Sequence, residues 1–168
     1  WQRSKQKTRH SVGEVVDQFI EMYGERQGVR GFSFSKDGEM LDRLVETFPF
    51  RETVDQMRCY EDVRRDMEDK SPMDRLVCGD VGFGKTEIAI RAALKAVVDG
   101  KQVVLLAPTT ILVDQLFKSF LSRLEPFGVF VRHLSRFTDP SDVKKTLSGL
   151  AASTVDVVVG THRLLSKD

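Results

Sequence analysis

The sequence lacks any apolar run that approaches the ~20 residues of a membrane-spanning helix, and its basic N-terminus lacks the apolar stretch of a signal peptide. Cysteine is scarce: Cys59 and Cys78 match neither a Cys-x-x-Cys redox pair nor a zinc spacing, so we expect reduced thiols. The apolar fraction of 40% and the charged fraction of 30% exclude a collagen-like, a disulfide-dense and a wholly disordered chain. These absences predict a soluble, cytoplasmic globular domain of 168 residues that does not contact membranes.

An excess of charge of one sign is absent as well. The chain has 26 basic and 25 acidic residues, a net charge of +1, and four of the basic residues lie among the first ten: Arg3, Lys5, Lys7 and Arg9. Without these four, 22 basic residues face 25 acidic ones, so the rest of the chain is slightly acidic. Any contact with nucleic acid must therefore come from local groups and not from overall charge.

Helical spacing of apolar residues organises the N-terminal part of the chain. Residues 1–10 are basic and polar and are expected to form a linker. Ser11 and Glu14 then form a Ser-x-x-Glu capping pattern ahead of an apolar stripe, which predicts that a helix begins at Ser11. Residues 24–38 are rich in glycine, serine and charge and predict a loop, and a short helix is expected over 40–47.

The second half of the chain alternates between apolar runs and helical segments. The first half of the chain also contains a predicted helix from Thr53 to about Glu68, because apolar residues recur there every three or four positions and Thr53 can cap it. The four runs that predict strands are Arg75–Cys78, Gln102–Ala107, Val129–Leu134 and Val155–Val159. The three helices expected between them are Lys85–Val98, Thr110–Leu124 and Asp139–Leu150.

This alternation of strand and helix predicts an α/β fold with a parallel sheet and right-handed crossovers. Runs such as Val103–Leu106 and Val157–Val159 are continuously apolar, which is typical of strands covered on both faces. We therefore expect a parallel sheet flanked by helices and preceded by an N-terminal helical arm.

One segment between a predicted strand and a predicted helix has the pattern G-x-x-x-x-G-K-S/T. Its residues are Gly79, Asp80, Val81, Gly82, Phe83, Gly84, Lys85 and Thr86, and Glu87 follows them. Glycines allow a sharp turn that points N–H groups at phosphate oxygens, and the following helix adds the positive end of its dipole. Lys85 is expected to contact the β- and γ-phosphates, and the Thr86 hydroxyl to hold Mg²⁺. The alternative is a glycine-rich turn with a chance Lys-Thr pair.

Five segments occur in the order seen in superfamily 2 DNA translocases: residues 48–56, 79–86, 107–112 with Gln115, 134–137 and 159–165. The chain resembles most closely the bacterial transcription-repair coupling factors, with the branched-DNA helicases of the RecG kind as near relatives. The resemblance spans essentially the whole chain. It implies a P-loop NTPase fold, with an incomplete RecA-like ATP-binding lobe over residues 48–168 and a basic linker and helical arm over 1–47.

The resemblance implies that this lobe is the ATP-binding half of an ATP-dependent double-stranded DNA translocase that uses ATP and Mg²⁺. The parent protein would displace a stalled RNA polymerase and recruit excision-repair proteins through parts outside these residues. The basic arm that starts at Trp1 favours a coupling factor over a RecG-like helicase. A small-molecule P-loop kinase and a non-catalytic interaction domain are further alternatives. Hydroxyl-rich turns after the strands argue against the first, and the intact Lys85 and Thr86 argue against the second.

The resemblance also implies how the adenine base is held. Gln56 lies where the family has a glutamine whose amide pairs with the adenine edge, and an amide has both a donor and an acceptor for that edge. Thr53-x-x-Gln56 is, however, also a capping box, so Gln56 could be purely structural. Either Phe48 or Phe50 is expected to stack on the base, and the sequence does not choose between them.

Other segments of the family hold the sugar-phosphate backbone of DNA. The residues that match them here are Pro108, Thr109, Thr110, Gln115, Arg136, Gly160, Thr161 and His162. Hydroxyls and amides suit a motor that slides along any sequence, because they contact phosphate and ignore bases. Ordinary helix caps at Thr110 and Thr161, and a solvated Arg136, are the alternative interpretations.

Hydrolysis in this class also needs an Asp-Glu pair after a further strand, one carboxylate to orient Mg²⁺ and one to activate water. No such pair follows Val155–Val159, and the family places its Asp-Glu-x-His motif shortly downstream of the Gly-Thr-His turn. We therefore expect these residues to be part of a longer protein. By themselves they should bind nucleotide weakly and hydrolyse it negligibly.

Overall fold

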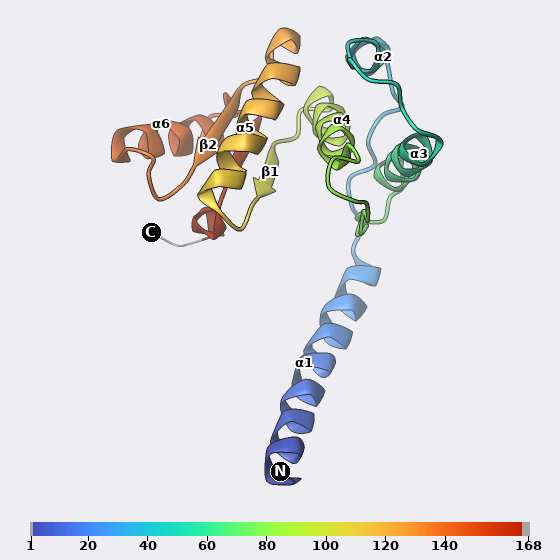
Figure 1. Ribbon diagram of the computed structural model, residues 1–168, viewed down its shortest axis with the longest axis vertical. Helices are drawn as coiled ribbons and strands as arrows, with labels where there is room; N and C mark the ends of the chain where they lie inside the picture. Colours follow the sequence, from blue (N-terminus) through green and yellow to red (C-terminus); the bar gives the residue numbers. More distant parts are fainter. Residues whose placement is uncertain (1, 166–168) are drawn as a thin grey trace.

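Runs of valine and leucine form a three-stranded parallel sheet in the computed structural model, which describes residues 2–165 (Figure 1). The strands are β1 (Val103–Leu106), β2 (Val131–Leu134) and β3 (Val157–Gly160), in the spatial order β1-β3-β2. Val157 of β3 pairs with Val103 on one side and with Val131 on the other, so the three carboxyl ends meet at one edge. The α/β class and the parallel sheet are thereby confirmed.

Six α-helices and two short 3₁₀ helices complete the described part of the chain. They are α1 (Gln2–Gly28), α2 (Glu39–Glu46), α3 (Val54–Glu68), α4 (Lys85–Val98), α5 (Thr110–Leu124), η1 (Glu125–Phe127), α6 (Pro140–Ala151) and η2 (His162–Leu165). The predicted bounds of α2 to α6 are confirmed to within one residue. Within residues 2–165, no helix is both long enough and apolar enough to cross a membrane.

α1 is longer than the sequence predicted. It begins at Gln2 and not at Ser11, and it continues to Gly28 through the first residues of the predicted loop. The residues before Ser11 contain no proline or glycine and are rich in arginine, lysine and glutamine, so the helix continues through the capping pattern. The side chains of Ser11 and Glu14 lie outside the described residues. The linker expected over 1–10 is therefore corrected to helix, and α1 extends away from the rest of the chain (Figure 1).

The run Arg75–Cys78, predicted as a fourth strand, pairs with none of the strands in the described residues. Its backbone is irregular, and the Leu76 side chain is 87% exposed. A four-residue strand depends on ladder hydrogen bonds to a neighbour, and no described strand lies beside this run to make them. The prediction was wrong because apolar composition indicates a tendency to extend but does not provide a partner strand.

The two faces of the sheet are covered unequally. Val157 and Val159 of β3 pack against α4 and α5 in the main core. On the opposite face, Val104 of β1 is exposed, and an apolar cavity of about 400 Å³ separates Val104 and Val158 from α6. The expectation of two covered faces is confirmed for β3, whose four residues are all buried, and is wrong for β1. The reason is position, because β3 is the central strand and β1 lies at the edge.

The main core joins α2, α4 and α5 to the sheet. Leu44 of α2, Leu94 of α4 and Phe120 of α5 are completely buried in it. Burial of each such side chain stabilises the fold by roughly 1.5–3 kcal/mol. The division into an arm, residues 1–47, and a lobe, residues 48–168, stays a prediction, although α2 of the arm contributes to the core of the lobe.

A buried ammonium group anchors the segment before α2. Lys95 of α4 is 2% exposed, and its Nζ donates to the Ser35 carbonyl oxygen at 2.6 Å, to Asp37 at 2.6 Å and to Glu68 at 2.9 Å. The Tyr60 hydroxyl donates to the other oxygen of Asp37 at 2.9 Å. Burial, together with this hydrogen bond and the charge of Asp37, raises the pKa of Tyr60 well above its ordinary value of 10.

The raised pKa of Tyr60 predicts a dependence of stability on alkaline pH. The folded chain keeps the Tyr60 proton at pH values where the unfolded chain loses it, so this contribution is present below about pH 10 and is lost as the pH rises further. We expect the free energy of unfolding in urea to fall between about pH 9 and about pH 11 more steeply in the wild type than in Tyr60→Phe. Tyr23→Phe, in the exposed part of α1, is the control, and equal slopes in all three proteins would contradict the prediction.

Candidate functional site

The loop Gly79–Thr86 bends sharply between the irregular run Arg75–Cys78 and the start of α4. Gly82 and Gly84 have φ angles of +84° and +73°, a left-handed backbone that glycine adopts without strain. Inside the bend, the Phe83 N–H donates to the Asp80 carbonyl oxygen at 3.3 Å. Within the described residues, no acceptor takes the N–H of Gly82, Gly84 or Lys85. These donors at the N-terminus of a helix form the kind of concavity that binds phosphate oxygens.

Lys85 places a cation in the same bend. Its Nζ donates to the carbonyl oxygens of Gly79 at 2.5 Å and of Asp80 at 2.6 Å, so the ammonium folds back over the loop. The side chain is exposed, and these carbonyls are acceptors that phosphate oxygens could replace. The half-buried Thr86 faces the cavity beside the loop, and its hydroxyl has no partner among the described residues. Lys85 and Thr86 therefore remain the candidate phosphate and Mg²⁺ residues of this loop.

The donor set also fits Mg²⁺ held by Thr86 together with phosphate oxygens. Mg²⁺ in nucleotide sites uses few protein ligands and takes oxygens from the phosphates. No group of three or more histidine, cysteine, aspartate or glutamate residues that could hold a metal ion occurs in the described part of the chain. The described residues therefore contain no cluster of side chains that could bind a metal ion without a nucleotide, and the Thr86 hydroxyl is the candidate ligand in the loop.

Gln56 is both a cap and a support of the loop. The side-chain Oε1 of Gln56 accepts from the Thr53 backbone N–H at 2.8 Å, and the Gln56 backbone N–H donates to Thr53 Oγ1 at 3.2 Å. These two hydrogen bonds complete the capping box of α3. The Gln56 Nε2 donates to the Phe83 carbonyl oxygen at 2.9 Å. A Cβ atom on Gly84 would lie 2.6 Å from this Nε2 and would displace the amide, and the φ angle of +73° also favours glycine at this position. The amide still has one N–H and one lone pair for a ligand.

A cavity of about 520 Å³ opens beside the loop. One wall is the segment 48–51, and others are the starts of α3 and α4, including Gln56, Thr86 and Glu87. The remaining wall is a part of α5 that the sequence did not indicate: Ser119, Ser122 and Arg123. These three residues lie on one face of α5, but no motif distinguishes them from an ordinary helix face, so only the fold reveals their position.

The two candidate stacking rings differ in their surroundings. Phe48 and Phe50 meet edge to face, with centroids 5.5 Å apart. Phe48 is half-buried, and the guanidinium carbons of Arg91 and Arg123 lie 5.6 Å and 5.7 Å from its ring centroid. Phe50 is 72% exposed and borders the cavity. Both rings line the cavity, but Phe50 is the more exposed of the two, whereas Phe48 also contacts two guanidinium groups.

Glu87, expected near the nucleotide, lines the cavity but has its carboxylate engaged. Its Oε1 accepts from Arg91 Nε at 3.1 Å and from Arg123 Nη2 at 2.7 Å, and its Oε2 accepts from Arg123 Nε at 3.2 Å. Arg91 also donates to Glu52 at 2.6 Å. Two carboxylates and two guanidinium groups thus form one ionic cluster behind the cavity. The remaining residues expected near the nucleotide, Asp80, Val81 and Phe83, are exposed on the loop.

The candidate DNA contacts gather at the carboxyl edge of the sheet, one set after each strand. Pro108, Thr109 and Thr110 follow β1, Arg136 follows β2, and Gly160, Thr161 and His162 close β3. Thr109 caps α5, because its hydroxyl accepts the Leu112 N–H at 3.3 Å. Parallel strands bring these segments together although they are far apart in sequence.

Close packing shapes the turn after β3. A Cβ atom on Gly160 would lie 2.6 Å from the Leu134 carbonyl oxygen and 2.6 Å from Leu164, so a larger residue would displace the turn. The Thr161 N–H donates to the same Leu134 carbonyl oxygen at 3.3 Å. The neighbouring His162 is exposed, so a ligand can reach it.

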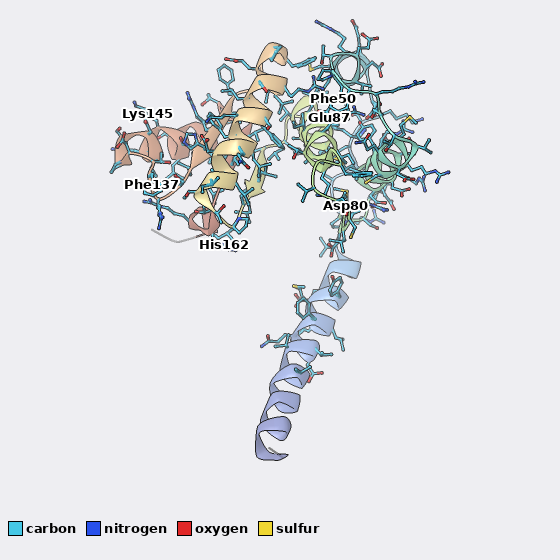
Figure 2. The ribbon with its side chains drawn as sticks, in the orientation of Figure 1. Phe50, Asp80, Glu87, Phe137, Lys145 and His162 are labelled. Carbon is cyan, nitrogen blue, oxygen red and sulfur yellow. The ribbon has the colours of Figure 1, made fainter. Side chains whose placement is uncertain are left out.

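Arg136 and Gln115 are also exposed. The Arg136 guanidinium lies over the ring of Phe137 at 4.7 Å. Figure 2 shows His162 and Phe137 on the sheet side of the molecule, and Asp80, Glu87 and Phe50 around α4. The structure thus brings the candidate DNA residues and the candidate nucleotide residues into two separate groups.

Comparisons with known proteins show the family to which the chain belongs. A profile of the DEAD/DEAH box helicase family matches residues 53–168. The transcription-repair-coupling factor of Bacillus subtilis is 49% identical over 168 residues, all of this chain and 14% of that protein. The protein of that name from Mycobacterium tuberculosis is 49% identical over 165 residues, 98% of this chain and 13% of that protein. The chain therefore spans about a seventh of the relatives it matches.

A structure of RecG bound to a three-way DNA junction superposes on 90% of this chain and 21% of that one, with a TM-score of 0.83 and 34% identity. The fold is accordingly a RecA-like lobe, with helices around a parallel sheet, and the resemblance to the bacterial transcription-repair coupling factors is confirmed. From its sequence profile and its architecture, the chain belongs to the DEAD/DEAH box helicase family.

Proposed function

We propose that this chain is the ATP-binding half of an ATP-dependent double-stranded DNA translocase, a transcription-repair coupling factor that displaces a stalled RNA polymerase and recruits excision-repair proteins. The observation that carries the proposal is the loop Gly79–Thr86, which combines the Lys85 ammonium with N–H groups that have no acceptor among the described residues. The coupling role rests on the relatives of that name, which match the whole chain. The polymerase and the repair proteins would contact parts of the protein outside these residues.

In the proposed nucleotide complex, phosphate oxygens accept from the loop N–H groups, and the Lys85 ammonium turns from the carbonyls of Gly79 and Asp80 toward the β- and γ-phosphates. The Thr86 hydroxyl is the protein ligand of Mg²⁺, which neutralises phosphate charge when it is bound. The adenine stacks on the exposed face of Phe50, and the free N–H and lone pair of Gln56 contact its edge.

In the proposed DNA complex, the hydroxyls and N–H groups that follow β1 and β3 hold phosphates of one DNA strand. Thr109, Thr110 and Thr161 provide these groups without a side chain that reaches a base edge. A charge-poor contact of this kind fits a chain whose net charge is only +1. A RecG-like helicase lobe is the second candidate, and the structural match to RecG favours it, although the sequence identity is lower than to the coupling factors.

The DNA contact can be tested on the chain itself by NMR titration with a short duplex. We expect the amide resonances of Thr109, Thr110 and Thr161 to shift and the effect to weaken as salt is raised, because phosphate contacts release counterions. Two duplexes of unrelated sequence should give the same shifts. The control is the face of α6 that holds Lys144 and Lys145, which should not respond. Shifts confined to these lysines, or shifts that depend on base sequence, would contradict the assignment.

A further inference from the structure

Arg123 is held by nearly all of its donors at the wall of the cavity. Its Nε and Nη2 donate to the two oxygens of Glu87, its Nη1 donates to Thr47 Oγ1 at 2.7 Å, and its Nη2 also donates to the Leu44 carbonyl oxygen at 2.8 Å. A guanidinium in a forked pair of this kind has a fixed position and plane. Arg123 therefore joins α5 to the end of α2 and to the first turn of α4.

The ring of Phe48 is placed by two guanidinium groups. Arg123 approaches the ring to 5.7 Å and Arg91 approaches it to 5.6 Å, both within the range of cation–π attraction. Arg91 is 3% exposed, and it also lies 5.4 Å from the Tyr60 ring, so it cannot move without disturbing the core. Contacts within the protein therefore hold Phe48 in place before any nucleotide binds.

Phe50 depends on Phe48 for its own position. The two rings pack edge to face, and the chain between them is the single residue Pro49, whose ring restricts the backbone. Phe50 is 72% exposed, and its ring contact in the described residues is with Phe48. The orientation of the free face therefore follows from the position of Phe48.

The ionic cluster has a cost that packing alone does not explain. Arg91 and Glu87 are almost completely buried, whereas the side chains of Glu52 and Arg123 are 22% and 17% exposed. The Nη2 of Arg91 is buried without a hydrogen-bond partner among the described residues. Apolar side chains of similar volume often stabilise such a site as well or better, so stability alone does not account for the cluster, and a role in fixing geometry is the alternative. Here the group that receives a fixed geometry is the Phe48–Phe50 pair.

We propose that Arg123 and Phe48 are positioning residues for the nucleotide base: they hold Phe50 in the orientation that stacks on a purine, and so they determine base preference and not phosphate affinity. The inference rests on the proposed function, because it assigns the cavity to the base of the same nucleotide. Neither residue lies in the loop Gly79–Thr86. Altering Phe48 should leave the phosphate contacts intact, and Arg123→Lys keeps a positive charge beside Glu87, the neighbour of Thr86.

The test compares Mg-ADP with Mg-UDP by calorimetric titration, because the two nucleotides share the ribose and diphosphate and differ only in the base. In the wild type we expect ADP to bind more tightly, since adenine offers a larger face for stacking. Arg123→Lys keeps the charge but loses the forked pair of hydrogen bonds to Glu87. In this variant we expect the affinity for ADP to fall by about tenfold and the affinity for UDP to change by less than about twofold. Phe48→Leu should give the same pattern, and it decides the outcome if Arg123→Lys does not fold.

Arg132→Lys is the matched control, because Arg132 is exposed on β2 and lies outside the cavity. Equal weakening of both nucleotides in the two variants would show a merely structural or phosphate role and would overturn the inference. Unchanged ADP affinity would overturn it too, as would a wild type without preference for ADP. If the wild type binds neither nucleotide, the proposed function itself fails, and that result is distinct from a loss of base preference.

Discussion

Lys85→Ala is expected to weaken the binding of Mg-ATP by at least about a hundredfold, because a charge-assisted contact to phosphate contributes roughly 1.5–3 kcal/mol and Lys85 would make more than one. The fold should persist, since the Lys85 side chain is exposed and its present partners are two carbonyl oxygens of its own loop. Calorimetric titration of the variant with Mg-ATP, beside a circular dichroism spectrum, measures both expectations.

The matched control for this variant is Lys144→Ala, which removes another exposed lysine, on α6 and far from the loop in sequence. It should bind Mg-ATP as the wild type does. If Lys85→Ala kept wild-type affinity, the bend of Gly79–Thr86 would be a structural turn, and the proposal of an ATP-binding lobe would be wrong. If both variants lost affinity equally, net charge and not the loop would determine binding.

Lys95→Met is expected to lower the free energy of unfolding by about 3–5 kcal/mol. The methionine fills the volume of the buried side chain but leaves Asp37 and Glu68 facing each other without the ammonium that now lies 2.6 Å and 2.9 Å from them. It also leaves the Ser35 carbonyl oxygen without its donor. Urea denaturation at neutral pH measures the change, and the loss should appear as a lower midpoint with a similar slope.

An exposed lysine pair provides the comparison. Lys118 donates to Asp114 at 2.7 Å, but its side chain is 71% exposed, so Lys118→Met should change stability by less than about 1 kcal/mol. Adding Asp37→Asn to Lys95→Met should recover part of the loss, because it removes one uncompensated charge. A Lys95→Met variant as stable as Lys118→Met would show that Asp37 and Glu68 are well solvated without their partner.

Local patterns predicted most of the elements because helix caps, helical spacing and glycine positions act over a few residues. Thr53 and Gln56 cap α3 as predicted, and α4 begins at Lys85, directly after the left-handed Gly84. The prediction that a helix begins at Ser11 was wrong because a capping pattern is also local and does not take account of the residues before it. A cap is favoured only where the preceding residues leave the helix, and the residues before Ser11 continue it.

The sequence by itself determined the glycine-rich loop Gly79–Thr86 and the bounds of α2 to α6, because each depends on residues that are neighbours along the chain. The alternation of strand and helix indicated a parallel sheet, but the pairing of its strands joins distant residues. Only the tertiary structure decided that Arg75–Cys78 has no described strand beside it and that Phe50 is more exposed than Phe48. It also revealed Arg123, which reaches Glu87 across 36 residues and Leu44 across 79. Strand pairing and ion pairing join residues that are distant in sequence, so a local pattern carries no signal for them.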